Sequence, residues 1–414
     1  MKILFENANL IRESTLKNIL IEDGLIQSVI DPSQIIHERD IQKIDLEGKV
    51  LLPGFVDIHM HLDKSFTYPT IHNKSGTLRE AIQNYSDYQA SVTFESLKKN
   101  MDKVIRNAIR HGTTALRTHL DGGSTEYVRH VVEAYLATKE KFSNYIYMEA
   151  VIMCPFNITK EIKEDIQWAI SNGVELIGGA PHLSDNPQRN LETIFDIAVS
   201  EDIDIDLHVD ESDSSEVNTL PAVCKLTNET KYNGRVIAGH CTSLSAMDTG
   251  KAHEILESVK ESGIGIVTLP GANMYLLGRN DHGIIRRGLT RIKEMINFDI
   301  PVALGSDNIQ DPFHPFGKAD LLQMALLGSY GGQLTSEEHM IKLIDMISTI
   351  PARLMNMEHN LKVGQSADFV ILNTRNQKLI LSEQTPTREV WKNGKRVCKV
   401  TEVIEFDFPF HETN

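Results

Sequence analysis

The chain has 414 residues, of which 41% are hydrophobic and 24% are charged, so a barrel-sized core with a small satellite domain is feasible. The formal net charge of -15 argues against nucleic acid or an anionic membrane surface as the main partner. No apolar stretch is long enough to span a bilayer, and the first residues, MKILFENANL, lack the apolar core of a signal peptide. We therefore expect a soluble, cytoplasmic protein.

The two ends of the chain have the same pattern of short apolar runs separated by turns, in residues 1–50 and again in residues 361–405. Neither end is long enough to form a stable β domain alone. We expect residues 1–53 and 358–414 to build one composite β-sandwich. Two independent terminal hairpins packed on the rest of the protein are the alternative.

Between these ends, short apolar runs alternate with longer amphipathic stretches, the first of which predicts a helix from Leu78 to about Arg110. Strands separated by helices require right-handed crossovers and a parallel sheet, and eight of them predict a closed (β/α)8 TIM barrel over residues 54–357. The predicted strands are residues 51–58, 113–120, 145–153, 174–179, 203–208, 235–240, 264–269 and 301–306.

Side chains that bind metals or move protons stand at the ends of four of these strands, where TIM-barrel active sites lie. His59 and His61 are two residues apart, so on a strand both imidazoles point to the same side. Each group taken singly is typical of an ordinary strand end, but the four together predict a metal site. The other groups are His208 with Glu211 three residues further on, His240, and Asp307.

These motifs stand in a stretch, residues 48–364, that resembles the amidohydrolase superfamily and, more narrowly, the cytosine deaminase family. The resemblance is carried by NKSGTLREAI (73–82), ALRTHLD (115–121), GGAPH (178–182), LHVDE (207–211), LLGRNDHGIIRRGLTRIKEM (276–295) and SDNIQDPFHPFGKADLLQ (306–323). HLDKSF (61–66) and SDNI (306–309) also resemble the N-alkylaminotriazine aminohydrolases. The resemblance implies a (β/α)8 barrel, a composite β-sandwich, one divalent metal ion, commonly iron or zinc, and a homo-oligomer.

The residue types support a hydrolytic mechanism. Three neutral imidazoles and a carboxylate suit Zn²⁺ or Fe²⁺ and leave a position open for water, whose pKa the metal lowers so that hydroxide can act as the nucleophile. Asp307 can accept the proton of that water, and Glu211 can pass a proton to a ring nitrogen and to the departing amine. His240 is either a fourth imidazole ligand or an electrostatic stabiliser of the reacting groups, and the resemblance favours the second role. The predicted metal ligands are His59, His61, His208 and Asp307.

The number of metal ions and the type of deaminase also follow from the sequence. Relatives with two metals bridge them through a carboxylated lysine or a carboxylate at the end of strand four, and residues 174–183 contain no lysine, so we expect one metal ion. The other zinc deaminase fold carries H-x-E followed by P-C-x-x-C. No P-C-x-x-C occurs here, which excludes that fold.

Other polar residues near these motifs have simpler interpretations. His119 ends the second predicted strand, and we expect it to support the site rather than to bind the metal. Asp63 and Lys64 follow the two metal histidines, and a structural salt bridge is the simpler interpretation. The four cysteines are too widely spaced for a CxxC site and are expected to be free thiols.

The resemblance weakens at the predicted substrate contacts. Cytosine deaminases carry a glutamine just after strand three that reads the amide face of the pyrimidine, but EAVIMCPFNI (149–158) has none, and Pro155 or a neighbour takes its place. Asn308 follows Asp307 where two aspartates are common, and Phe313 stands where tryptophan is frequent. His182 lies above strand four, near the expected substrate. Loss of a hydrogen-bonding partner can cost a factor of roughly 10⁴ in discrimination, so the ring itself stays open.

We therefore predict a hydrolytic deaminase of an amino-substituted nitrogen heterocycle, cytosine or a close analogue, with release of ammonia. The first alternative is removal of an amine or alkylamine from an s-triazine or another heterocycle. The second alternative is hydrolysis of a cyclic amide or imide. A non-catalytic metal-binding protein is disfavoured, because every metal-binding and proton-transfer group is retained.

Overall fold

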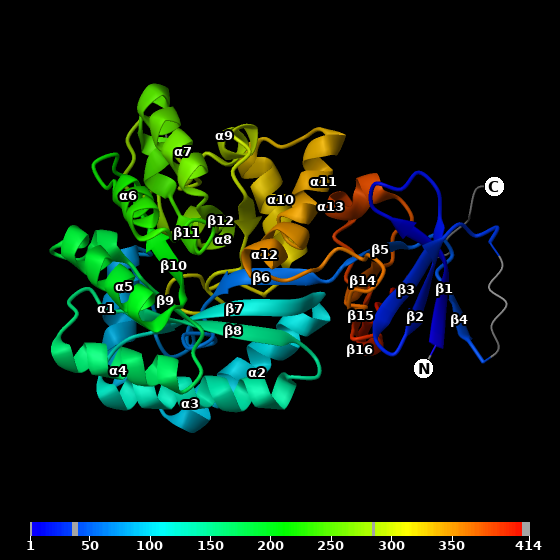
Figure 1. Ribbon diagram of the computed structural model, residues 1–414, viewed down its shortest axis with the longest axis horizontal. Helices are drawn as coiled ribbons and strands as arrows, with labels where there is room; N and C mark the ends of the chain where they lie inside the picture. The colour runs from blue at the N-terminus through cyan, green and yellow to red at the C-terminus, as the bar shows by residue number, and fades with distance from the viewer. Residues whose placement is uncertain (1, 35–39, 284–285, 408–414) are drawn as a thin grey trace.

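The computed structural model describes residues 2–34, 40–283 and 286–407, which form a barrel with a separate sheet beside it (Figure 1). In this part of the chain, eight parallel strands follow one another around the barrel in sequence order. The strands are β6 (Phe55–Met60), β7 (Thr113–Asp121), β8 (Tyr147–Cys154), β9 (Leu176–Gly179), β10 (Asp204–Val209), β11 (Val236–His240), β12 (Gly265–Thr268) and β13 (Val302–Leu304).

The barrel closes between its last and first strands. The backbone N–H of Asp307 donates to the carbonyl of His59 at 2.9 Å, and Met60 forms an isolated parallel bridge with Asp307. Ser306 N–H donates to the Asp57 carboxylate at 3.0 Å from the same segment. The predicted (β/α)8 architecture is confirmed.

Helices surround the barrel (Figure 1). The predicted helix over residues 78–110 is wrong in one respect, since two helices occupy this stretch. Thr93 and Ser96 form a capping box that starts the second helix. The helices are α1 (Leu78–Gln89), α2 (Phe94–Arg110), α3 (Thr125–Phe142), α4 (Lys160–Ser171), α5 (Pro187–Glu201), α6 (Leu220–Thr230), α7 (Thr249–Ser262), α8 (Pro270–Leu276), α9 (Ile292–Asn297), α10 (Leu321–Gly332), α11 (Glu337–Asp345), α12 (Thr349–Leu354) and α13 (Ile380–Glu383), with 3₁₀ turns η1 (Pro181–Leu183), η2 (Thr242–Ala246) and η3 (Gln377–Leu379).

The two ends of the chain share one sheet, in the order β16-β15-β14-β5-β1-β2-β3, with β4 beside β1. β5 from the N-terminal end pairs antiparallel with β14 from the C-terminal end, which confirms the composite unit and rules out independent hairpins. Phe5, Phe369 and Trp391 anchor its own core, with ring centroids 4.9–5.7 Å apart. The strands are β1 (Lys2–Leu10), β2 (Lys17–Glu22), β3 (Leu25–Ile30), β4 (Gln42–Asp45), β5 (Val50–Pro53), β14 (Phe369–Leu372), β15 (Arg388–Lys392) and β16 (Lys395–Val400).

The chain passes from this sheet into the barrel at Gly54. The predicted strand over residues 51–58 is in fact two strands, because β5 ends at Pro53 and β6 begins at Phe55. A Cβ atom on Gly54 would lie 2.2 Å from Thr114 Oγ1, so only glycine fits this crossing. As a result His59 lies inside β6, and the carboxyl ends of the barrel strands point away from the terminal sheet (Figure 1). The exact domain limits stay a prediction.

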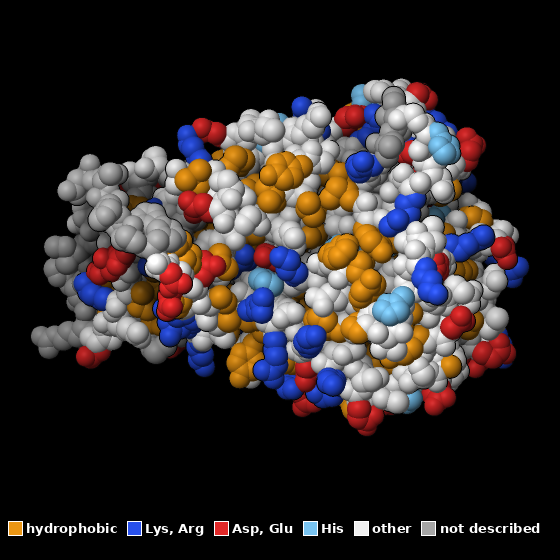
Figure 2. All heavy atoms as spheres, turned by 180° about the vertical axis from the view of Figure 1, so that it is seen from behind, with side chains coloured by type: hydrophobic (Ala, Val, Ile, Leu, Met, Phe, Trp, Pro, Cys, Tyr) orange, Lys and Arg blue, Asp and Glu red, His pale blue; other side chains and the backbone are white. Residues whose placement is uncertain are grey.

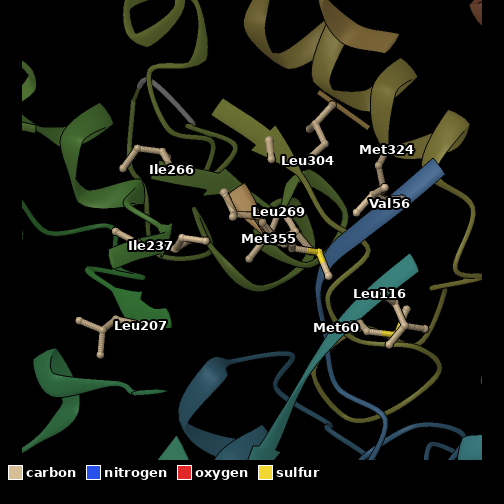
Figure 3. Packing of buried hydrophobic residues seen from close by; sticks show 14 of the residues in the cluster. Val56, Met60, Leu116, Leu207, Ile237, Ile266, Leu269, Leu304, Met324 and Met355 are labelled. Atoms are coloured by element: carbon tan, nitrogen blue, oxygen red, sulfur yellow. The ribbon is translucent and has the colours of Figure 1, made fainter. Parts of the chain in front are cut away.

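Buried aliphatic side chains from successive strands fill the space around the barrel wall (Figure 3). Val56, Leu116, Leu207 and Ile266 are fully buried. Close packing of this kind fixes the strand ends with little freedom, which the site requires.

Figure 2 shows the molecule from behind. On this face neither acidic nor basic side chains predominate, and both are interspersed with exposed apolar side chains. No helix among the described residues is both long and apolar enough to cross a bilayer.

The interior of the barrel contains a buried ion cluster. Arg117 on β7 donates to Glu149 on β8 at 2.6 Å and to Asp206 on β10 at 2.7 Å. All three side chains are at most 8% exposed. Burial opposes the charge on Arg117, but the two carboxylates hold the pKa of its guanidinium above the ordinary value. The cluster ties three strands together below the strand ends.

Replacing Arg117 by methionine is therefore expected to lower the free energy of unfolding by about 3–5 kcal/mol, because two buried carboxylates lose their counter-charge. The measurement is chemical denaturation followed by circular dichroism. Arg396→Met is the matched control, since Arg396 pairs with Glu389 at 3.4 Å with its own side chain 48% exposed, and it should cost about 0–1 kcal/mol. Equal losses in the two variants would contradict a structural role for the cluster.

Candidate active site

The predicted metal ligands meet at the carboxyl end of the barrel. His61 Nε2 lies 3.1 Å from His208 Nε2 and 3.4 Å from Asp307 Oδ1. His59 Nε2 lies 3.8 Å from the same Asp307 oxygen. All four side chains are buried, with at most 7% of each residue exposed. The structure thus brings together four groups from distant parts of the sequence, supplied by β6 and the residue that follows it, by β10, and by the segment after β13.

The nitrogen atoms of this group have few other partners. Both ring nitrogens of His59 and Nδ1 of His208 are buried with no hydrogen bond to any described residue. Burial, reinforced by neighbouring imidazoles and Lys64, lowers the pKa of His59, His61 and His208 well below the ordinary value. Neutral imidazoles with unshared lone pairs directed at one another are the form that binds Zn²⁺ or Fe²⁺. The residues therefore fit a divalent metal, and His59, His61 and His208 form one group with suitable spacing.

His240 lies on the other side of this group. Its ring centroid is 4.9 Å from that of His208 and 5.4 Å from that of His59. His59, His240 and Asp307 form a second set with metal-compatible spacing, so spacing alone leaves both roles of His240 open.

One amide holds His240 and Glu211 side by side. The Asn273 Nδ2 group, on α8, lies 3.0 Å from Glu211 Oε1 and 2.9 Å from His240 Nδ1. Asn273 is 1% exposed, and the sequence analysis missed it. The available signal was a single amide in the otherwise apolar segment LPGANMY after the seventh predicted strand.

This contact fixes the tautomer of His240. An amide NH₂ group can only donate, so Nδ1 of neutral His240 accepts and Nε2 carries the ring proton. His240 Nε2 is buried and has no partner among the described residues. A histidine arranged in this way can donate a hydrogen bond to a group at the centre of the site.

The carboxyl groups sit in an environment that favours their protonated forms. Burial raises the pKa of Glu211 to about 8, against the opposing effect of the Asn273 hydrogen bond. Burial, together with the charge of Glu211, raises the pKa of Asp307 well above its ordinary value. A carboxyl group with a pKa close to neutral pH, as for Glu211, suits general acid–base chemistry.

The backbone around the site is constrained. Asp210, His240 and Asp307 have φ angles of 50°, 67° and 59°, a left-handed conformation that is uncommon for residues other than glycine. The Asp210 carboxylate accepts from Thr219 N–H at 2.8 Å and from Leu220 N–H at 3.0 Å, at the start of α6. These contacts hold the turn that carries Glu211.

Lys64 and Asp63 lie in a polar network beside His61. Lys64 Nζ donates to Asp121 Oδ1 at 2.6 Å and lies 3.0 Å from His61 Nδ1. Burial opposes its charge, but Asp121 and Asp63 raise the pKa of Lys64 above the ordinary value. Asp63 accepts from the backbone of Asp121 and the hydroxyl of Tyr127, each at 3.0 Å. A salt bridge therefore forms as expected, although with Asp121 rather than Asp63.

His119 lies behind the candidate metal ligands. Its ring centroid is 4.0 Å from that of His59, and its Nε2 is 3.4 Å from Asp206 Oδ1. These three residues form a further set with metal-compatible spacing. Because Arg117 already pairs with Asp206, this set has its negative charge compensated without a metal. The arrangement agrees with the supporting role expected for His119.

A cavity of about 280 Å³ opens above the ligands. Three of the predicted substrate contacts, Pro155, Asn308 and Phe313, line it together with His61, His208 and Glu211. His182 is not among the lining residues, whereas Ala180 and Leu183 on either side of it are. Roles in substrate binding stay a prediction for all four residues.

Comparison with known proteins agrees with this architecture. A model of the amidohydrolase family matches residues 42–88 and 152–398. The pterin deaminase of Rhizobium rhizogenes is 30% identical over 91% of this chain and 87% of its own length. The N-isopropylammelide isopropyl amidohydrolase of a Pseudomonas species is 28% identical over 86% of this chain and 88% of its own length. The structure of 5-methylcytosine deaminase from Klebsiella pneumoniae with 5-fluorocytosine superposes with a TM-score of 0.90 at 26% identity, over 99% of this chain and 100% of the other.

The family match covers well over half of the chain, and it confirms both the resemblance stated above and the predicted class of enzyme. The chain belongs to the amidohydrolase family and is a hydrolase of carbon–nitrogen bonds.

Proposed function

We propose that this protein is a metal-dependent deaminase that hydrolyses an amino-substituted nitrogen heterocycle and releases ammonia. The observation that carries the proposal is the pair Glu211 and His240, held by the single Asn273 amide beside the group of candidate metal ligands. Hydrolysis at an amino-bearing ring carbon requires a proton donor for a poorly basic ring nitrogen and for the departing amine. In this proposal Glu211 has that task.

Each side chain has a distinct part in this proposal. His59, His61, His208 and Asp307 hold one divalent metal, Zn²⁺ or Fe²⁺, which supplies Lewis-acid activation of water. The Asp307 carboxylate takes up the proton of the attacking water. Glu211, protonated at the start, gives its proton to the ring nitrogen and then carries the second proton of the water from the new hydroxyl group to the amine, because ammonia leaves readily only once protonated. The proton on Asp307 then returns to Glu211, which restores the starting state. His240 donates from Nε2 to the developing negative charge.

The relatives and the cavity volume support a limited range of candidate substrates. Relatives named for the deamination of 5-methylcytosine and of pterin support a ring with an exocyclic amine next to a ring nitrogen. A volume of about 280 Å³ has room for one or two fused rings. Cytosine and close analogues are the leading candidates, pterins are included among the analogues, and an N-alkylated triazine is the alternative supported by the Pseudomonas relative.

The purified, metal-loaded protein is expected to release ammonia from at least one member of a panel of cytosine, 5-methylcytosine, isocytosine, pterin and aminotriazines. Glu211→Gln should lower kcat by about 10²–10⁴-fold, because the proton carrier is lost. Glu216→Gln, an exposed glutamate on the same loop, should leave kcat unchanged. The deaminase proposal is wrong if no amine is released by the wild-type protein and Glu211→Gln retains no panel compound in binding assays.

Metal analysis should find one Zn²⁺ or Fe²⁺ per chain. Removal by a chelator is expected to abolish activity and to lower the melting temperature, since a ligand that binds the folded state stabilises it. His59→Asn should weaken metal affinity by more than about 100-fold. His253→Asn is the control, because His253 bonds Glu294 at the surface, and its metal content should match the wild type. Full metal content in His59→Asn would contradict the proposed ligand set.

The two roles of His240 are separable by experiment. If His240 donates a hydrogen bond to the reacting group, His240→Asn keeps a full complement of metal while kcat falls by about 10²–10³-fold, as for the loss of one oxyanion donor. If His240 is a fourth ligand, metal content falls together with kcat. Mass-spectrometric metal analysis of the variant, alongside steady-state kinetics, distinguishes the two.

A further inference from the structure

One face of α1 forms a wall of the cavity. The residues of this helix that line the cavity repeat at helical spacing, so they share one face, apolar towards its start and polar towards its end. They are Leu78, Ile82, Tyr85, Ser86 and Gln89. The other two glutamine and asparagine side chains of the helix have partners: Gln83 bonds Asp87, and Asn84 bonds the carbonyl of His72.

The amide of Gln89 is free. It lines the cavity, and no hydrogen bond connects its side chain to another described residue. Its oxygen lies 3.0 Å from the position that a Cβ atom on Gly123 would take. The absence of a side chain at Gly123 is what lets this amide lie against the loop after β7.

On the far side of the same loop stands Pro155. A Cβ atom on Gly122 would lie 2.7 Å from Pro155 Cδ and 2.5 Å from the carbonyl of Met153. Gly122 and Gly123 therefore lie close to Pro155 and to Gln89, respectively. The end of β8 and the residue after it line the cavity with Met153, Cys154 and Pro155, which offer no amide side chain.

Several of the other polar side chains that line the cavity already have partners, whereas Ser86 offers a single hydroxyl group and His240 keeps an unpartnered Nε2. Asn308, the other amide that lines it, donates its NH₂ group to Asp311 at 2.8 Å. Lys64 pairs with Asp121 and can only donate. Glu211 bonds Asn273. Gln89 thus offers the cavity a donor and an acceptor in one plane that no other described lining residue leaves unshared.

We propose that Gln89 recognises the lactam edge of the substrate, which is an adjacent ring N–H and C=O. Gln89 would then make the amide contact that Pro155 cannot make. A primary amide pairs with a lactam through two parallel hydrogen bonds, one donated and one accepted. Cytosine presents such an edge at N1–H and C2=O, one ring nitrogen away from its amino-bearing carbon, and pterin presents one at N3–H and C4=O, next to its amino-bearing carbon. The compounds 4-aminopyrimidine and 2-aminopteridine lack the carbonyl. The inference rests on the proposed deamination of a heterocycle.

The test compares Gln89→Leu with Gln83→Leu, the same change on the outer face of the same helix. With whichever of cytosine or pterin the wild type deaminates, Gln89→Leu is expected to lower kcat/KM by about 10–100-fold, mostly through KM. The partner compound without the carbonyl should lose less than about 3-fold, and Gln83→Leu should match the wild type on both. Metal content and melting temperature are measured for each variant.

Gln89→Glu provides a second measurement should the leucine variant fold poorly. It keeps the size of the side chain but removes the donor, so it should discriminate against the lactam compound to a similar extent. If both variants treat the two compounds as the wild type does, Gln89 does not read the lactam. That result differs from failure of the proposed function, in which the wild-type protein itself releases no ammonia from any compound of the panel.

Discussion

The hydrogen bond from Asp307 N–H to the His59 carbonyl, 2.9 Å long, closes the barrel and at the same time sets the candidate metal site. The two residues it joins are both expected ligands, so the register between β13 and β6 fixes the separation of their side chains. Gly305 makes the approach possible, since a Cβ atom there would lie 2.9 Å from the same His59 carbonyl. A slip of one residue at this seam would turn the alternate side chains away from the site. Fold and site therefore depend on one constraint.

That constraint explains why so many polar groups can be buried here. Uncompensated imidazoles and carboxylates lose hydration on burial, and each would destabilise the barrel by itself. Arg117 compensates the carboxylates in the interior of the barrel, and a divalent cation would compensate Asp307 at the strand ends. Asn273 completes the arrangement by donating to a carboxylate and an imidazole at once. The Arg117 cluster is therefore balanced in charge by its own residues, whereas a bound cation would balance the charge of the candidate metal site.

Much of this arrangement could be predicted from the sequence, because it depends on local patterns. His59-x-His61, His208 and Asp307 follow apolar runs, and parallel strands bring their carboxyl ends to one edge regardless of the details of packing. Other features depend on contacts between segments far apart in the sequence. Gly54 stands between two strands that the sequence presents as one apolar run. Thr114, far away in the sequence, occupies the space that a side chain at position 54 would need. Asn273 becomes significant only when the fold brings α8 to Glu211 and His240.

Gln89 is another residue whose significance depends on contacts between segments far apart in the sequence. Its position in the sequence, at the end of an amphipathic helix, is typical of a solvated surface residue, and no motif marks it. It lines the cavity from the last position of α1, before the chain reaches the capping box at Thr93 that starts α2. In the proposed mechanism the groups for bond cleavage follow the strand ends, whereas the proposed contact with the lactam comes from α1, a helix inserted after the first strand of the barrel. Helices in such connections accept substitutions without disturbing the seam between β13 and β6, because they contribute no strand pairing. In this proposal a substitution on α1 would therefore alter the choice of substrate while the candidate metal ligands are kept.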